Sequence, residues 1–236
     1  MFRELIQAFR KKDSVGGMIE HVGEMLDDGQ WMFATAGAVV HKQQSASEVQ
    51  DELYRRDRRI NRLEYEIRRN ILVHLAMGNM QDVSICLVLM SVAKDAERVG
   101  DYCKNIFEIG RYFRSRYGRT EYAGPLDDVR QTILEAFPRT KHVFLKGDAR
   151  SGEQLREDLI RARHRCDLLI QQLLSPGFPG TADEAVAYAL RARFLKRTNS
   201  HLANIVTSVT NPVPMIDFRD RSPGDDDEDE GGDSND

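Results

Sequence analysis

The sequence lacks the features that mark several large classes of protein. It contains only three cysteines in 236 residues and no CxxC spacing. Three cysteines cannot all pair with one another, so we expect buried thiols in a reducing compartment. No apolar run approaches the roughly 20 residues of a membrane-spanning helix. The opening residues, MFRELIQAFRKK, lack the unbroken apolar segment of a secretion signal. The sequence therefore predicts a cytoplasmic protein.

Motifs for catalysis are also missing. The chain has no P-loop, no GxSxG and no glycine-rich dinucleotide turn. Its six histidines form no metal-ligand spacing, and no glutamate is followed by histidine three residues later. That Glu-x-x-His spacing is what a di-iron helical bundle requires. A non-enzyme is therefore the favoured interpretation, and a carboxylate-bridged metal enzyme of the di-iron type is the alternative.

What the sequence does contain is the helical period. Apolar residues recur every three to four positions in almost every segment, and no stretch alternates as a strand does. Seven helices are predicted: Phe2–Lys11, Ser14–Lys42, Ser45–Met77, Met80–Tyr117, Leu126–Lys146, Gly152–Leu174 and Thr181–Thr210. Long helices with short connections pack antiparallel.

The break at Gly118–Pro125 divides these helices into two sets of three. We expect an all-α protein with a leader helix at 1–12, a first three-helix repeat at 13–118 and a second at 124–215. The remainder, 216–236, is an acidic tail. Residues 225–236 hold eight acids and no base, which leaves 34 basic and 30 acidic residues elsewhere. Mutual repulsion in the tail predicts disorder.

Two polar rows accompany the apolar stripes of the third and fourth predicted helices. The stripes are Val49, Leu53, Ile60, Leu63, Ile67 and Ile71, and Leu89, Ala93, Ala96, Gly100, Cys103 and Phe107. The rows are Asp57, Asn61, Glu64 and Arg68, and Glu97, Asp101, Asn105 and Glu108. Each row lies on the same rotational side of its stripe, so antiparallel packing brings both rows to one side of the shared seam.

Four side chains, Asp57, Asn61, Glu97 and Asp101, should converge on this seam. Carboxylate and amide oxygens suit Mg²⁺, Mn²⁺ or iron. The alternative is a solvated helix face whose acids are neutralised by Lys94, Lys104 and the nearby arginines. Gly100 favours close approach of another helix, because an interior glycine costs about 1 kcal/mol relative to alanine.

These motifs carry a resemblance. SVAKDAERVGDYCKNI (Ser91–Ile106) is similar to the signature helix of the PhoU family, with its acidic residue, Arg, apolar residue, Gly, Asp, and later Asn-Ile. The matching positions are Glu97, Arg98, Val99, Gly100, Asp101, Asn105 and Ile106. RRDRRINRLEYEIRRNILVHLA (Arg55–Ala76) resembles the preceding helix of that family.

The resemblance implies a bundle of two three-helix repeats, dimerisation and an acidic metal site. The implied ligands are Asp57, Asn61, Glu97, Asp101 and Asn105, for Mg, Mn or Fe. It also implies a negative regulator of phosphate uptake that acts with a phosphate-specific ABC transporter and a sensor histidine kinase.

The second repeat departs from this pattern. Aligning Asn204-Ile205 with Asn105-Ile106 places Lys196 at the position of Glu97 and Ser200 at that of Asp101. The nearest counterpart of Asn61 is Asp167, about two turns too close to Lys196. We therefore expect a single metal site, in the first repeat.

Two basic segments admit further interpretations. Arg55–Arg69 contains seven arginines, but these alternate with acids and lack interleaved aromatics, which favours a solvated face over nucleic-acid binding. Phe2–Lys12 has one apolar face and ends in three basic residues. It suits either peripheral contact with a membrane surface or packing on the bundle.

Overall fold

The computed structural model describes residues 13–115, 118 and 120–211. They form six long helices and one 3₁₀ turn: α2 (Asp13–Val40), α3 (Ala46–Ala76), η1 (Met80–Asp82), α4 (Val83–Tyr112), α5 (Thr120–Lys146), α6 (Ala149–Leu174) and α7 (Ala182–Thr210). No strand occurs in these residues, and the predicted all-α fold is confirmed. The predicted leader helix and acidic tail lie outside the described residues.

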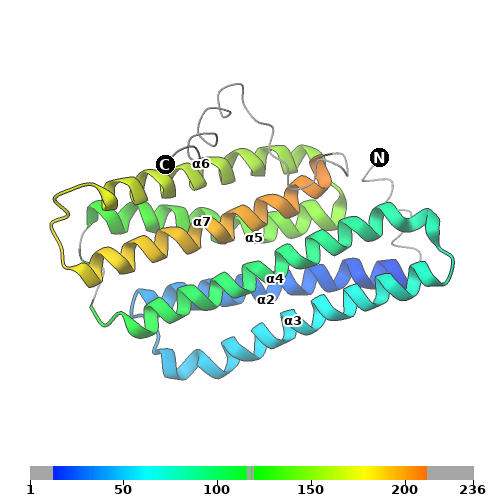
Figure 1. Cartoon of the computed structure of the whole chain (residues 1–236), viewed down its shortest axis with the longest axis horizontal. Helices are drawn as coiled ribbons and strands as arrows, with labels where there is room; N and C mark the ends of the chain where they lie inside the picture. The colour runs from blue at the N-terminus through cyan, green and yellow to red at the C-terminus, as the bar shows by residue number, and fades with distance from the viewer. Residues whose placement is uncertain (1–12, 116–117, 119, 212–236) are drawn as a thin grey trace, which may run out of the picture.

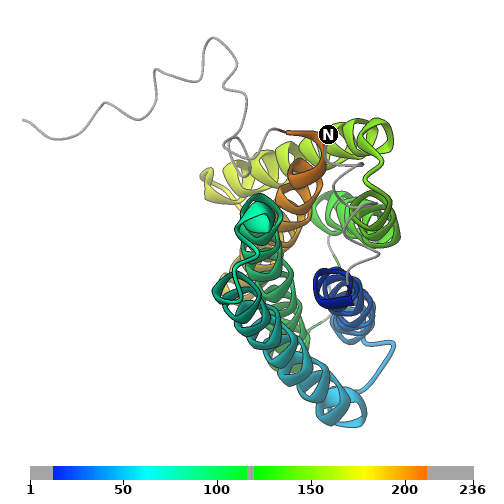
Figure 2. The same cartoon turned by 90° about the vertical axis from the view of Figure 1, so that its right-hand side faces the viewer.

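The six helices run along the long axis of the molecule in two sets of three (Figure 1). Helices α2, α3 and α4 form the first set, and α5, α6 and α7 form the second. The end-on view shows α3 and α6 on the outside, whereas α4 faces α7 and α2 faces α5 between the sets (Figure 2). None of the helices described is long and apolar enough to cross a membrane.

One large hydrophobic core extends through both sets of helices, and Ile109, Phe113 and Ala187 form a second, small cluster. The predicted stripe of α4, from Leu89 to Phe107, is buried throughout, and so is most of the α3 stripe. The three cysteines are free and buried, as expected for structural thiols. The helical period of the sequence thus identifies correctly which faces are packed inside.

Most of the predicted helix boundaries agree with the structure, and their local signals explain why. Gly78 ends α3 with a φ of 89°, a conformation that favours glycine. The sequence suggests capping boxes at Thr181 with Glu184 and at Ser47 with Gln50, from their three-residue spacing. The first forms at the start of α7. The second is wrong, because Ser45 is the N-cap of α3 and its side chain makes no cap hydrogen bond.

Two helices of the second repeat begin earlier than predicted. Helix α6 begins at Ala149 rather than Gly152, because the Asp148 carboxylate accepts a hydrogen bond from the Ser151 backbone N–H at 3.2 Å. Helix α5 begins at Thr120 rather than Leu126 and contains Pro125. The added turn packs Tyr122 against Phe178, with ring centroids 5.3 Å apart, which offsets the hydrogen bond that proline cannot donate.

Helix α4 ends at Tyr112, five residues before the predicted end at Tyr117. The Lys42 ammonium donates to the carbonyl oxygens of Gly110 and Phe113, at 2.7 and 2.5 Å. A cation at this point satisfies carbonyl groups that a helix C-terminus leaves unpaired. This terminal contact ties the end of α2 to the end of α4.

Buried polar groups join the two repeats. On α4, Asp95 is 1% exposed and is bonded to His201 Nδ1 at 2.7 Å and to Asn204 Nδ2 at 3.3 Å, both on α7. At one end of the bundle, the buried Arg191 of α7 pairs with Asp127 of α5 within the second set, and it also lies 3.2 Å from His41 Nε2 of the first set. Breaking either contact would leave a charge inside the core, so these pairs fix how the two halves meet.

A second pair of contacts strengthens the end of the bundle where Arg191 lies. His41 Nε2, at the end of α2, is 2.9 Å from the Asp127 carboxylate. Burial raises the pKa of Asp127, but the hydrogen bonds from His41 and Arg191 outweigh it and hold that pKa at about 2. The carboxylate therefore stays ionised and links α2, α5 and α7.

Candidate functional site

The predicted polar rows meet where α3 and α4 approach most closely. At Gly100 of α4, a Cβ atom would lie 3.0 Å from Ile60 Cδ1 of α3. A larger side chain here would force the helices apart, so glycine permits the close packing that the sequence predicts. This contact fixes the rotation of both helices and sets which polar residues face the seam.

Asp57 and Asp101 converge on one ammonium group. Lys104 Nζ lies 3.0 and 3.1 Å from the two carboxylate oxygens of Asp57 and 3.1 Å from Asp101 Oδ1. Asp57 is only 8% exposed. Burial lowers the pKa of Lys104, but the two aspartates raise it more, so the net shift is upward. The predicted convergence of Asp57 and Asp101 therefore takes place around a lysine.

Glu97 extends the acidic row by one turn of α4. Its carboxylate is largely buried, and Arg98 Nε is 3.6 Å away. Burial raises the pKa of Glu97 to about 7, with further upward contributions from Asp101 and Glu64. Near neutral pH Glu97 is therefore partly protonated, and Arg98 also lies 3.3 Å from Asp101.

The two predicted asparagines lie further from this centre. Asn61 is exposed on α3. Asn105 lies beside an apolar groove of about 570 Å³ between the end of α4 and the start of α7. The groove is also lined by Tyr112, Leu190 and Phe194. The structure therefore brings together Asp57, Glu97 and Asp101, and does not bring Asn61 or Asn105 onto the same lysine.

The donor set fits a hard divalent cation, with one obstacle. Asp57, Glu97 and Asp101 offer only oxygen ligands, which suit such a cation. In the described residues, no three His, Cys, Asp or Glu side chains form a ready-made metal cluster. The Lys104 ammonium stands between the two aspartates instead. A metal ion can use these ligands only if that ammonium leaves.

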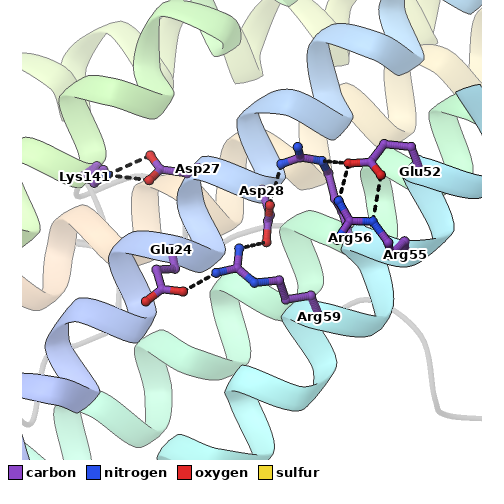
Figure 3. Close-up of polar contacts among 8 residues, drawn as sticks. All are labelled: Glu24, Asp27, Asp28, Glu52, Arg55, Arg56, Arg59 and Lys141. Atoms are coloured by element: carbon purple, nitrogen blue, oxygen red, sulfur yellow. Dashed lines mark hydrogen bonds and ion pairs between the residues drawn. The ribbon is translucent and has the colours of Figure 1, made fainter.

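A second polar network, which the sequence did not reveal, covers the seam between α2 and α3 (Figure 3). Asp28 of α2 is 2% exposed and accepts hydrogen bonds from Arg56 and Arg59 of α3, each at 2.6 Å. Arg59 also pairs with Glu24, and Glu52 pairs with Arg56 at 2.7 Å.

These contacts engage much of the arginine-rich face within the molecule. Arg55 is paired with Glu52 at 2.7 Å and Arg68 with Glu64 at 2.7 Å. Arginines already held by carboxylates are poorly placed to neutralise nucleic-acid phosphates. Four arginines of this stretch are thus paired with carboxylates of the same chain. In the sequence, the only indication of this pairing was the alternation of acidic and basic residues.

The second repeat has the same seam with different contents. Asn199 of α7 donates from Nδ2 to the Leu159 carbonyl oxygen of α6 at 2.7 Å. Asn199 and Leu159 are separated by 40 positions, as are Gly100 and Ile60. This equal spacing places Ile160, rather than Asp167, at the position of Asn61. The counterpart inferred from the sequence was wrong, because Asp167 was chosen for its chemistry and not for its register.

The residues that replace the acids in α7 are engaged locally. Lys196 pairs with Asp167 of α6. The Ser200 hydroxyl donates to the Lys196 carbonyl oxygen at 2.9 Å. This seam therefore contains one lysine and one carboxylate, whereas in the first repeat one lysine bridges two carboxylates, Asp57 and Asp101.

Comparison with known proteins connects this arrangement to a family. Residues 15–110 match the model of the PhoU domain. The fold is similar to the phosphate transport system regulatory protein PhoU from Streptococcus pneumoniae, with a TM-score of 0.66, 17% identity, and coverage of 82% of this chain and 93% of that one. PhoU from Pseudomonas aeruginosa gives a TM-score of 0.66 at 15% identity, covering 89% of this chain and 97% of that one. No curated protein matches the chain.

Proposed function

We propose that this protein is a non-enzymatic regulator of phosphate transport, because residues 15–110 match the model of the PhoU domain and the described helices have a fold similar to that of two PhoU proteins. The observation that carries the proposal is the family match over the repeat that contains the acidic row of α4. The structurally similar proteins are described as regulators of phosphate transport or as PhoU. The proposed action is negative regulation of phosphate uptake.

The proposed partners are a phosphate-specific ABC transporter, or another phosphate transporter, and a sensor histidine kinase. We also propose that the protein works in the cytoplasm as a homodimer, with peripheral contact at the inner face of the membrane. A helical bundle with many paired charges on its described surface is suited to action by contact. The di-iron enzyme is not favoured, since no histidine accompanies Asp57, Glu97 and Asp101 at the seam.

The acidic metal site is part of this proposal. Asp57, Glu97 and Asp101 would supply the charged ligands, and Asn61 and Asn105 are the amides nearest to them in sequence. Bound Mg²⁺, Mn²⁺ or iron would supply positive charge that cross-links α3 and α4 through its oxygen ligands. The support for it is the convergence of three carboxylates and the raised pKa of Glu97.

Phosphate uptake in the native cell tests the regulatory proposal. Deleting the gene should raise the initial rate of radioactive phosphate uptake in phosphate-rich medium, and the wild-type gene should restore the low rate. Capture of the tagged protein from membranes should recover transporter or kinase subunits in amounts that change on phosphate starvation. An unchanged uptake rate in the deletion strain would contradict negative regulation.

A further inference from the structure

We propose that one end of the first repeat docks on an anionic lipid surface. This end, which we call the α3–α4 tip, comprises residues 72–87: the end of α3, the connecting turn η1 and the start of α4. It lies at one extreme of the long axis of the molecule (Figure 1). The inference rests on the peripheral membrane contact proposed above and names the surface that makes it.

The α3–α4 tip exposes large apolar side chains. Met77 is 76% exposed and Met80 is 61% exposed. Three further apolar side chains of the tip are at least half exposed: Leu72, Val73 and Leu87. Complete burial of one such side chain contributes about 1.5–3 kcal/mol, so partial insertion of several is enough for reversible binding. Apolar side chains gathered at one exposed end are typical of a contact surface.

The α3–α4 tip is also almost free of charged residues. Between Arg69 and Lys94, Asp82 is the only Asp, Glu, Lys or Arg, although these residues make up 31% of the chain. Asp82 is 1% exposed, and its carboxylate lies 2.8 Å from Nε2 of His74, which is 7% exposed. The only carboxylate of the tip is therefore turned inward, where it neither repels an anionic headgroup nor loses water when the tip meets lipid.

A basic segment joins the bundle at the same end. Ser14 Oγ, at the start of α2, lies 3.0 Å from Nδ1 of His74 at the end of α3. Residues 1–12 therefore connect to the bundle beside the tip, and they contain one acid and four bases: Glu4, Arg3, Arg10, Lys11 and Lys12. Each base near an anionic membrane contributes about 1 kcal/mol to binding. The apolar tip and the basic segment can therefore contact one membrane together.

This combination favours a lipid surface over a protein partner. A protein interface adds hydrogen bonds and fixed charges to its apolar contacts. The tip instead presents the flexible side chains of Met77 and Met80 on an exposed turn, and these can enter an acyl layer without a matching shape. Basic residues beside an apolar insertion then select anionic lipids.

Co-sedimentation with protein-free vesicles tests the proposal on the full chain. The wild type should bind vesicles of equimolar phosphatidylcholine and phosphatidylglycerol, and less so as salt is raised. Met77→Gln with Met80→Gln should lower the partition coefficient about tenfold, because two apolar side chains no longer enter the lipid. The matched control, Leu174→Gln with Val186→Gln, alters two exposed apolar side chains at the opposite end of the bundle and should leave the coefficient unchanged.

Removal of residues 2–12 tests the electrostatic part. The shortened protein should lose its preference for the anionic vesicles over vesicles of phosphatidylcholine alone, since the four bases are gone. An unchanged preference would show that this segment takes no part in docking.

A fluorescent probe on the tip shows whether this end enters lipid. Met80→Cys can be labelled selectively, because the three native cysteines are buried. An environment-sensitive dye at this position should shift to shorter wavelength when the anionic vesicles are added. The same dye attached to Leu174→Cys should keep its spectrum. Equal shifts at the two positions would contradict docking through the tip.

The outcomes separate this proposal from the regulatory one. Equal vesicle binding by the wild type and by Met77→Gln with Met80→Gln would overturn docking through the tip. Absence of wild-type binding would also overturn it and leave the regulation of phosphate transport standing, because these vesicles contain no transporter. If the variant lost binding only to native membranes with their proteins, the tip would be a protein contact and not a lipid contact. An unchanged phosphate uptake rate with vesicle binding intact would overturn the regulation alone.

Discussion

The seams α3–α4 and α6–α7 occupy equivalent places in the two repeats and differ in what fills them. In the first, Gly100 allows Ile60 to pack on the α4 backbone, and three carboxylates gather beside it. In the second, Asn199 takes the glycine position and spans the seam by a hydrogen bond to Leu159. Close packing at a glycine thus joins α3 to α4, whereas an amide hydrogen bond joins α7 to α6.

The two seams also differ in their charged side chains. Lys196 and Asp167 form a one-to-one pair in the second repeat. In the first repeat, Lys104 contacts Asp57 and Asp101, and Arg98 lies 3.3 Å from Asp101 and 3.6 Å from Glu97. The first seam thus holds a larger cluster of charges than the second. We therefore propose the first repeat as the place of the acidic metal site.

The largest expected effect comes from filling the glycine position. Gly100→Leu should lower the free energy of unfolding by about 3 kcal/mol, because the added side chain overpacks the seam against Ile60. Chemical denaturation measures this loss. Asn199→Leu at the equivalent position already has space for a side chain and should cost much less. Equal losses in the two variants would show that the seams are not closed differently.

Removing the lysine of each seam should lower the free energy of unfolding by a smaller amount, and the loss should differ between the two repeats. Lys104→Met should lower the free energy of unfolding at neutral pH by about 2 kcal/mol, since it leaves the nearly buried Asp57 without its cation. Lys196→Met should cost about 0.5 kcal/mol, because Asp167 is 36% exposed. Denaturant melts of both variants in chelator test the difference. A greater loss in the second repeat would contradict it.

The pH dependence sharpens the comparison further. Because the folded-state pKa of Glu97 is raised to about 7, its contribution to stability is complete below the pKa of the unfolded chain, 4.5, and is lost as pH rises through 7. Allowing for solvent screening of the partly exposed side chain, the metal-free protein should be about 2 kcal/mol more stable at pH 5 than at pH 8 from this group. Glu97→Gln should remove that difference, as read from denaturation at the two pH values.

Lys196→Gln, the matched change in the second repeat, is the control and should keep the pH dependence. If Glu97→Gln retained it as well, another group would be responsible. A wild-type protein with flat stability across this range would indicate that the arginines already neutralise the row.

Much of this site could be predicted from helical periodicity alone. The stripes and rows depend only on the rise and turn of one helix, so Asp57 and Asp101 were correctly assigned to a shared seam. The position of Lys104 depends on how its side chain bends back between two helices. From the sequence, neutralisation of the acidic row by Lys94 and Lys104 was only an alternative to the metal site. In the structure, Lys104 pairs with two acids of the row, whereas Lys94 lies 3.7 Å from Asp95.

Other features depend on contacts between helices that no single-helix pattern encodes. The pairing of Asp28 with Arg56 and Arg59 requires the relative rotation of α2 and α3. The early start of α5 depends on the packing of Tyr122 against Phe178. This packing outweighs the tendency of Pro125 to end or delay a helix. The register of the second repeat became clear only from the contact of Asn199 with Leu159.

The most direct test of the central claim is the thermal stabilisation produced by Mn²⁺ in paired variants. At a tenfold excess over its dissociation constant, the ion should stabilise the wild type by about 1.4 kcal/mol, seen as a rise in Tm. Glu97→Ala with Asp101→Ala should abolish the rise, and Lys196→Ala with Ser200→Ala should preserve it. A full metal response in the first double variant, or its loss in the second, would contradict a cation site confined to the first repeat.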